Sequence, residues 1–149
     1  MWFMNKIVNP LMSWILLSPF HKLMSASVLL LTYCGLKSHK SYRLPVQYVQ
    51  DGKMIYILPG MPEKKVWWRN LRGGAPVEIM LAGKHLAGHA EVLPENADPA
   101  LAAGILAKYF QRFPPSARLH GLQPLPDGSY NREDLLALSS TVKIVSVRL

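Results

Sequence analysis

Residues 31–48 read LTYCGLKSHKSYRLPVQY, and the interpretation of the chain starts from this stretch. An apolar run ends at Gly35, a short basic turn follows, and a second run begins with a proline near its start. A turn of this kind between two strands is a place where a phosphate can be held by charge-assisted hydrogen bonds. Backbone N–H groups, the Ser38 hydroxyl and the ammonium groups of Lys37 and Lys40 would supply the donors.

Composition and charge indicate one folded domain whose basic surface is either simply solvated or binds an anionic partner. The chain has 149 residues, half of them hydrophobic, and a formal net charge of +8. Eight basic residues lie between residues 37 and 72, against Asp51 and Glu63, so this window alone carries +6. Such a field attracts phosphates, nucleic acid or anionic lipid. Cys34 is the single cysteine of the sequence, which suits a reducing compartment, and its apolar surroundings predict a buried side chain.

The first 26 residues differ from the rest of the chain. Residues 2–20 contain one charge, Lys6, and their apolar positions follow the 3.6-residue period of a helix face. Two prolines interrupt the run before the roughly 20 apolar residues that a spanning helix needs. A signal peptide is disfavoured because a single lysine precedes the apolar run. We expect an amphipathic helical segment over residues 1–26 that caps the core or lies on a membrane surface, followed by one domain over residues 27–149.

The body of the chain predicts a mainly β fold with peripheral helices. Pro45 predicts either that its strand lies at a sheet edge or that it occupies a position where the missing N–H is harmless, and Asp51-Gly52 predicts a hairpin. About six strands with hairpin-length links favour an antiparallel sheet closed into a small barrel. Strands are expected over 27–34, 42–50, 54–58, 76–81, 85–92 and 141–149, and helices over 66–72, from Pro99 to before Pro114, and over 132–138, with a loop over 116–129.

Several common functional motifs are missing from the sequence. It has no dinucleotide fingerprint, no P-loop and no nucleophile elbow. His85 and His89 are four residues apart, but they fall on a predicted strand with no third ligand nearby, so we expect no metal site. Tyr33, Tyr48 and Tyr56 are candidate proton donors, but core packing is the preferred explanation for each of them. The catalytic residue is therefore left unassigned.

Four segments taken together resemble a known family. LLTYCGLKSHK (30–40), PVQY (45–48), DG (51–52) and WWRNL (67–71) are similar, in this order, to the deazaflavin-dependent nitroreductase (quinone reductase) family. The resemblance runs from about residue 10 to residue 92. It implies a split β-barrel of the flavin-reductase type, usually dimeric, which binds a deazaflavin coenzyme (F-420 type) or, alternatively, FMN. It also implies a cytoplasmic protein. If the N-terminal segment contacts the membrane, the protein would be peripheral on its inner face.

The resemblance assigns expected roles to individual positions. The basic turn would hold the cofactor phosphate or acidic tail, Pro45 and Tyr48 would shape the strand beneath the ring, and Trp67 and Asn70 would brace the loop above it. The family has an arginine and a glycine where this chain has Leu36 and His39. Two lysines in the loop before Trp67 would replace the lost charge. The expected cofactor contacts are Lys37, Ser38, His39, Lys40, Pro45, Tyr48, Lys64, Lys65, Trp67, Trp68 and Asn70.

Three functions follow from these features, in order of preference. The first is an oxidoreductase in which the reduced cofactor delivers hydride to a quinone, nitro group or activated alkene. The second is a non-catalytic binder of a flavin-like or lipophilic ligand. The third is single-stranded nucleic-acid binding through the basic window and Trp67-Trp68, because stacked aromatics among cations suit that partner.

Overall fold

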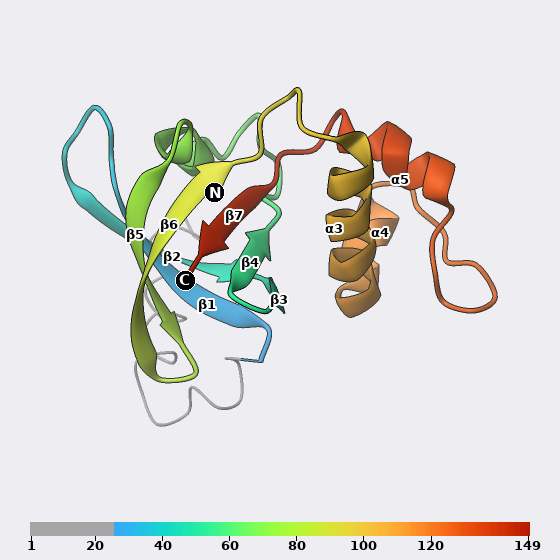
Figure 1. The fold of residues 1–149 in the computed structure, drawn as a ribbon, viewed down its shortest axis with the longest axis horizontal. Helices are drawn as coiled ribbons and strands as arrows, with labels where there is room; N and C mark the ends of the chain where they lie inside the picture. The colour runs from blue at the N-terminus through green and yellow to red at the C-terminus, as the bar shows by residue number, and fades with distance from the viewer. Residues whose placement is uncertain (1–25) are drawn as a thin grey trace.

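The computed structural model describes residues 26–149, which form a curled antiparallel sheet with three helices packed beside it (Figure 1). The seven strands follow the order β2-β1-β5-β6-β7-β4-β3, and each neighbouring pair is antiparallel. This arrangement confirms the expected mainly β fold with peripheral helices, with one strand more than expected. The N-terminal segment predicted for residues 1–26 lies outside the described residues apart from Ala26.

Most elements agree closely with the predicted ranges, and the exceptions are given below. The strands are β1 (Val28–Cys34), β2 (Ser41–Gln47), β3 (Val49–Asp51), β4 (Met54–Ile57), β5 (Ala75–Leu81), β6 (Lys84–Val92) and β7 (Val145–Arg148). The helices are the short 3₁₀ helix η2 (Trp67–Leu71), α3 (Pro99–Arg112), α4 (Pro114–Leu119) and α5 (Arg132–Ser139). Within residues 26–149, none of these helices is long and apolar enough to cross a bilayer.

The β1–β2 hairpin forms one edge of the sheet. β1 lies between β2 and β5, and Leu29, Leu30 and Leu31 are almost fully buried. Pro45 of β2 pairs with Leu30. Because β2 is the outermost strand, no neighbouring strand lies on its outer side to accept a hydrogen bond from residue 45. Proline can therefore occupy β2 without loss of a bond on that side, which confirms the predicted edge position.

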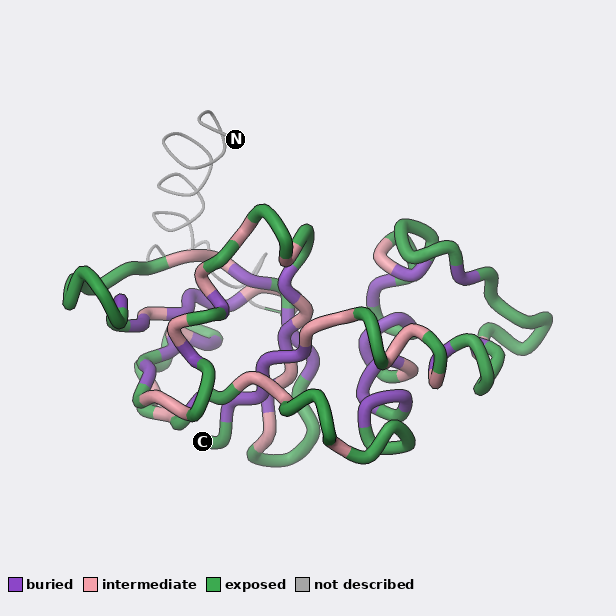
Figure 2. Tube along the Cα trace, turned by 90° about the horizontal axis from the view of Figure 1, so that it is seen from above, coloured by how far each residue is buried: buried purple, intermediate pink, exposed green. Residues whose placement is uncertain are grey.

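Two hydrophobic cores stabilise the molecule, one inside the curled sheet and one between the helices (Figure 2). The first contains Trp68 and Leu71 of η2, which therefore packs onto the sheet. The second forms around Phe110 of α3, whose carbonyl accepts a hydrogen bond from the Tyr130 hydroxyl. An ion pair between Lys108 of α3 and Asp51 of β3 adds a link between the two parts.

The helix ends follow from their capping residues. The Asp98 side chain accepts from the Ala100 N–H at 2.9 Å, with Pro99 at the first helical position, as predicted for the start of α3. Asn131 caps α5 by accepting from Glu133 N–H at 2.8 Å. Helix α4 was expected to be a loop from residue 116 onwards. That expectation was wrong because prolines at the first turn are compatible with a helix.

Three further expectations are corrected. Cys34 is exposed, because it is the last residue of β1 and the pairing of β1 with β5 ends at Thr32. The strand expected over 42–50 is divided into β2 and β3 at Tyr48. The last strand begins only at Val145, because the N–H groups of residues 141 and 142 still bond to the Leu138 carbonyl at the end of α5.

The turn after β1 gives a test of the fold. A methyl group at Gly35 would overlap the Ser38 Oγ and lie 2.8 Å from Tyr42 Cε2. We expect Gly35→Ala to lower the free energy of unfolding by about 1–3 kcal/mol, measured by urea denaturation. Gly104→Ala is the matched control, because nothing lies within 4 Å of that position on α3. It should raise the free energy of unfolding by about 1 kcal/mol. Equal stability of Gly35→Ala and the unaltered protein would contradict the packing described.

Candidate functional site

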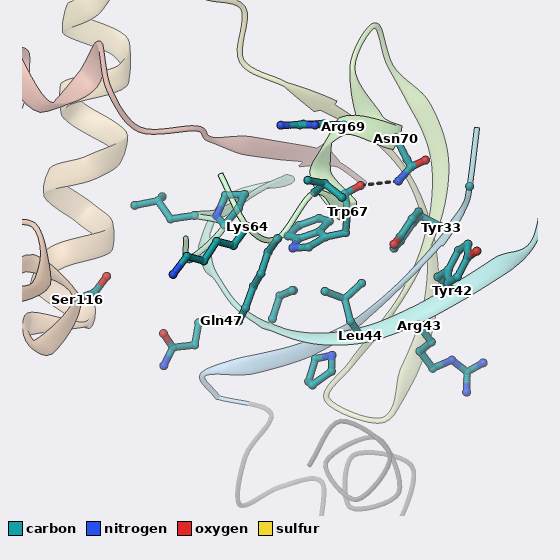
Figure 3. A pocket seen from close by; sticks show the side chains of 18 of the residues that line it. Tyr33, Tyr42, Arg43, Leu44, Gln47, Lys64, Trp67, Arg69, Asn70 and Ser116 are labelled. Carbon is teal, nitrogen blue, oxygen red and sulfur yellow. Dashed lines mark hydrogen bonds between the residues drawn. The ribbon is translucent and has the colours of Figure 1, made fainter. Parts of the chain in front are cut away.

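A cleft of about 1300 Å³ lies between the concave side of the sheet and the helices (Figure 3). One wall consists of β2 and the turn between β1 and β2. The opposite walls are the loop that leads into η2, and the end of α3 with α4. The cleft therefore brings together parts of the chain from residue 33 to residue 119.

The lining of this cleft is strongly basic. Within residues 26–149, no aspartate or glutamate lines the cleft, so none of these residues offsets the positive charge. Such a surface favours a ligand with several negative charges. The basic lining residues are Lys37, Arg43, Lys64, Lys65, Arg69 and Arg112.

The turn of residues 35–40 is closed by its own backbone. Gly35 N–H donates to the Lys40 carbonyl, and His39 N–H donates to the Gly35 carbonyl, both at 2.9 Å. His39 has a positive φ of 53°, a conformation that glycine adopts most readily. Histidine is among the residues that enter this region more often than most, which explains how the turn keeps its shape here.

Ser38 is held so that its hydroxyl proton is available. Its Oγ accepts hydrogen bonds from the Tyr42 hydroxyl at 2.9 Å and from Lys40 N–H at 3.3 Å. A hydroxyl has two acceptor sites and one donor. With both acceptor sites used, the group can only donate to a ligand, and this suits a phosphate oxygen.

The backbone contributes less to the turn's binding capacity than the sequence indicated. Of the six residues 35–40, four have an N–H that is already bonded to other described residues: Gly35, Leu36, His39 and Lys40. Only the N–H groups of residues 37 and 38 are left for a ligand. Anion binding at this turn therefore depends mainly on side chains.

Asn70 joins the turn to η2. Its Oδ1 accepts from Leu36 N–H at 2.9 Å. Its Nδ2 donates to the Trp67 carbonyl at 2.9 Å, the bond drawn in Figure 3. The first of these bonds connects positions 34 residues apart in the chain, and the second is local to η2. The side-chain amide thereby fixes the basic turn relative to the aromatic wall of the cleft.

Three aromatic rings from different elements form that wall. The rings of Tyr33 and Tyr42 are stacked with centroids 5.6 Å apart, and the Trp67 ring lies 6.2 Å from that of Tyr33. Burial raises the pKa of Tyr33, and the neighbouring Tyr42 adds to the rise. The phenol therefore stays protonated at neutral pH.

The structure places seven of the eleven expected contact residues in the cleft. Tyr48 and Trp68 are instead buried in the sheet core, and His39 and Lys40 are exposed on the turn without lining the cleft. Trp68 supports the site indirectly, since its Nε1 donates to the Pro62 carbonyl at 3.0 Å and so holds the loop that carries two lysines. The seven in the cleft are Lys37, Ser38, Pro45, Lys64, Lys65, Trp67 and Asn70.

Other residues of the cleft were not identified from the sequence as ligand contacts. Arg43 and Arg69 stood out only as part of the basic window. Arg112 and Phe113 lie at the end of α3, more than 40 residues from the nearest expected contact. No local sequence signal indicates that this helix end reaches the cleft. The candidate donor Tyr56 packs against the helical core and is not among the lining residues.

The Asn70 clamp gives the second test. We expect Asn70→Ala to speed hydrogen exchange of the Leu36 N–H about tenfold, because that N–H loses its protein acceptor. Hydrogen exchange followed by mass spectrometry measures this. Asn131→Ala removes a comparable amide at the start of α5 and should leave Leu36 unchanged. Unaltered exchange at Leu36 in Asn70→Ala would show that the turn is held by something else.

Comparisons with known proteins agree with this geometry. Two solved structures share the fold, each with a TM-score of 0.57 and 15% sequence identity over 82% of this chain. One is described as an F420-H2 Dependent Reductase (FDR-A), of which 94% is covered, and the other as a domain-swapped dimer, of which 80% is covered. They confirm the split-barrel architecture. A search of curated proteins finds no significant match.

The model of one protein family matches residues 19–111, and its description is F420H(2)-dependent quinone reductase. The match covers more than half of the chain and includes the basic turn, β2, the lysine-bearing loop and η2. It confirms the family resemblance seen in the sequence, and with it a deazaflavin as the family's cofactor. The chain therefore belongs to the F420H(2)-dependent quinone reductase family of oxidoreductases.

Proposed function

We propose that this protein binds a reduced deazaflavin in the cleft and uses it to reduce a quinone, a nitro compound or an activated alkene. The observation that carries the proposal is the basic lining of the cleft, free of aspartate and glutamate, in a chain of this family. A phosphorylated cofactor with an acidic tail is attracted by several cations and repelled by neighbouring carboxylates. The residues present fit such a group.

The phosphate end of the cofactor would lie at the turn. Lys37 supplies an ammonium group there, and the Ser38 hydroxyl is restricted to donating by its two accepted bonds. Lys64 and Lys65 face the same cleft from the loop before η2. Charge-assisted hydrogen bonds from these side chains would hold the anionic part of the ligand.

The planar part of the cofactor would lie along β2. Leu44, Pro45 and Val46 line this part of the cleft, and Trp67 lies across from them (Figure 3). Apolar and aromatic surfaces exclude water and orient a flat ring.

The bound deazaflavin supplies the hydride, and the protein supplies binding, orientation and exclusion of water. Leu58, Phe113 and Leu119 give the helical side of the cleft an apolar surface for the substrate. Among the lining residues within 26–149 there is no carboxyl or imidazole group, so of these residues a hydroxyl or a lysine ammonium group would give the product its proton, with water as the other source. Burial raises the pKa of Tyr109 to about 12, so this lining residue stays protonated throughout the neutral range.

The direct test mixes the purified protein with reduced deazaflavin and a panel of quinones, nitro compounds and activated alkenes. We expect quinone-dependent loss of the reduced cofactor's signal, followed by absorbance. The same assay with reduced FMN decides between the two cofactors. Absence of turnover with the deazaflavin and every acceptor would overturn the proposal. Ligand binding without turnover would favour a non-catalytic binder.

A charge variant tests the role assigned to the turn. We expect Lys37→Ala to weaken deazaflavin binding about tenfold. This is the lower end of the range for loss of a hydrogen bond to a charged group, and we choose it because Lys37 is exposed to solvent. Fluorescence titration measures the dissociation constant. Lys84→Ala removes an equally exposed lysine outside the cleft and should bind like the unaltered protein. Equal weakening by both variants would indicate a general charge effect.

Two features of the family resemblance extend the proposal. A homodimer is supported by the neighbour described as a domain-swapped dimer, and light scattering of the purified protein tests it.

Peripheral contact of residues 1–26 with a membrane is supported by their amphipathic sequence alone. Sedimentation with anionic and with neutral lipid vesicles tests that contact.

A further inference from the structure

Tyr33 has a side chain that core packing alone does not explain. It lies in β1, two residues before the turn that begins at Gly35, and its side chain is 8% exposed. A ring so buried contributes to the core, and phenylalanine would do the same. Tyr33 nevertheless lines the cleft, so the part of the side chain that remains accessible faces the ligand space.

The hydroxyl of Tyr33 is available to a ligand. No described residue forms a hydrogen bond with it, and within residues 26–149 no side-chain oxygen or nitrogen is buried without a partner. The oxygen therefore reaches solvent in the cleft. Figure 3 shows it on the side of the ring that faces Trp67 and Leu44.

The position of this hydroxyl is fixed by its neighbours. Tyr33 and Tyr42 are paired across β1 and β2, and their rings are stacked at an interplanar angle of 23°. The Tyr42 hydroxyl is engaged with Ser38 at the turn. Tyr42 therefore serves the phosphate end, while Tyr33 presents its donor farther inside the cleft.

We propose that the Tyr33 hydroxyl donates a hydrogen bond to the ring-bearing part of the bound cofactor, beyond the phosphate. The inference rests on the proposed function, because it takes the cofactor to be held at the turn. A ligand anchored there extends past β1 and β2 and so passes the Tyr33 oxygen. The raised pKa of Tyr33 keeps the donor proton in place at neutral pH.

Tyr33→Phe tests this contact, because it removes one oxygen and keeps the ring. We expect the dissociation constant for oxidised deazaflavin, measured by fluorescence titration, to rise about three- to tenfold, with an unchanged melting temperature. Tyr56→Phe is the matched control, since Tyr56 is half-buried in a strand outside the cleft. It should bind like the unaltered protein.

A second probe separates the ring from the phosphate. Inorganic pyrophosphate has no ring, so it cannot make the proposed contact. Its dissociation constant should therefore be the same for Tyr33→Phe and for the unaltered protein. Unchanged deazaflavin affinity in Tyr33→Phe, or an equal loss of pyrophosphate affinity, would overturn this inference alone. Absence of deazaflavin binding by the unaltered protein would overturn it together with the proposed function.

Discussion

The two hydrogen bonds of the Asn70 side chain hold together the parts of the cleft that lie far apart in sequence. The turn of residues 35–40 and η2 have separate local causes: a glycine turn between two strands, and a short helix whose Trp68 and Leu71 enter the sheet core. Neither element requires the other. The amide of Asn70 has one acceptor and one donor end, and here each end binds the backbone of one wall. Alanine offers neither group, and aspartate offers only the acceptor.

Charge and packing act together around this clamp. The lysines of the loop before η2 and the cations of the turn carry the same charge and repel each other. Other contacts must therefore hold these two segments close together. The loop is kept in place by the bond from Trp68 Nε1 to the Pro62 carbonyl, and the Trp68 ring is itself covered by the Arg72 guanidinium, 4.8 Å from its centroid. The contacts of the buried Trp68 ring thus offset the repulsion among these basic residues. An anionic ligand would relieve the remaining repulsion, so binding and local stability should be coupled.

Much of this arrangement could be predicted from local sequence. Pro45 indicated the edge strand, Asp51-Gly52 the hairpin, and Asp98-Pro99 the start of α3, because each depends on backbone preferences of a few residues. The burial of individual residues and their positions in the tertiary structure were harder to predict. Cys34 looked buried because its neighbours are apolar, yet the pairing of β1 with β5 ends at Thr32, two residues before it. Trp67 and Trp68 could not be told apart by type, although one lines the cleft and the other fills the core. Arg112 reaches the site only because α3 ends there, which no motif near it signals.

In the function proposed above, the basic cleft selects its cofactor through the anionic side chain. Fluorescence titration of the full-length protein with two ligands tests this directly: the complete deazaflavin coenzyme, and the same ring system without its phosphate-bearing side chain. The complete coenzyme should bind at least about tenfold more tightly at low ionic strength, and added salt should reduce this advantage. Equal affinity for the two ligands at low salt, or binding of neither, would contradict it.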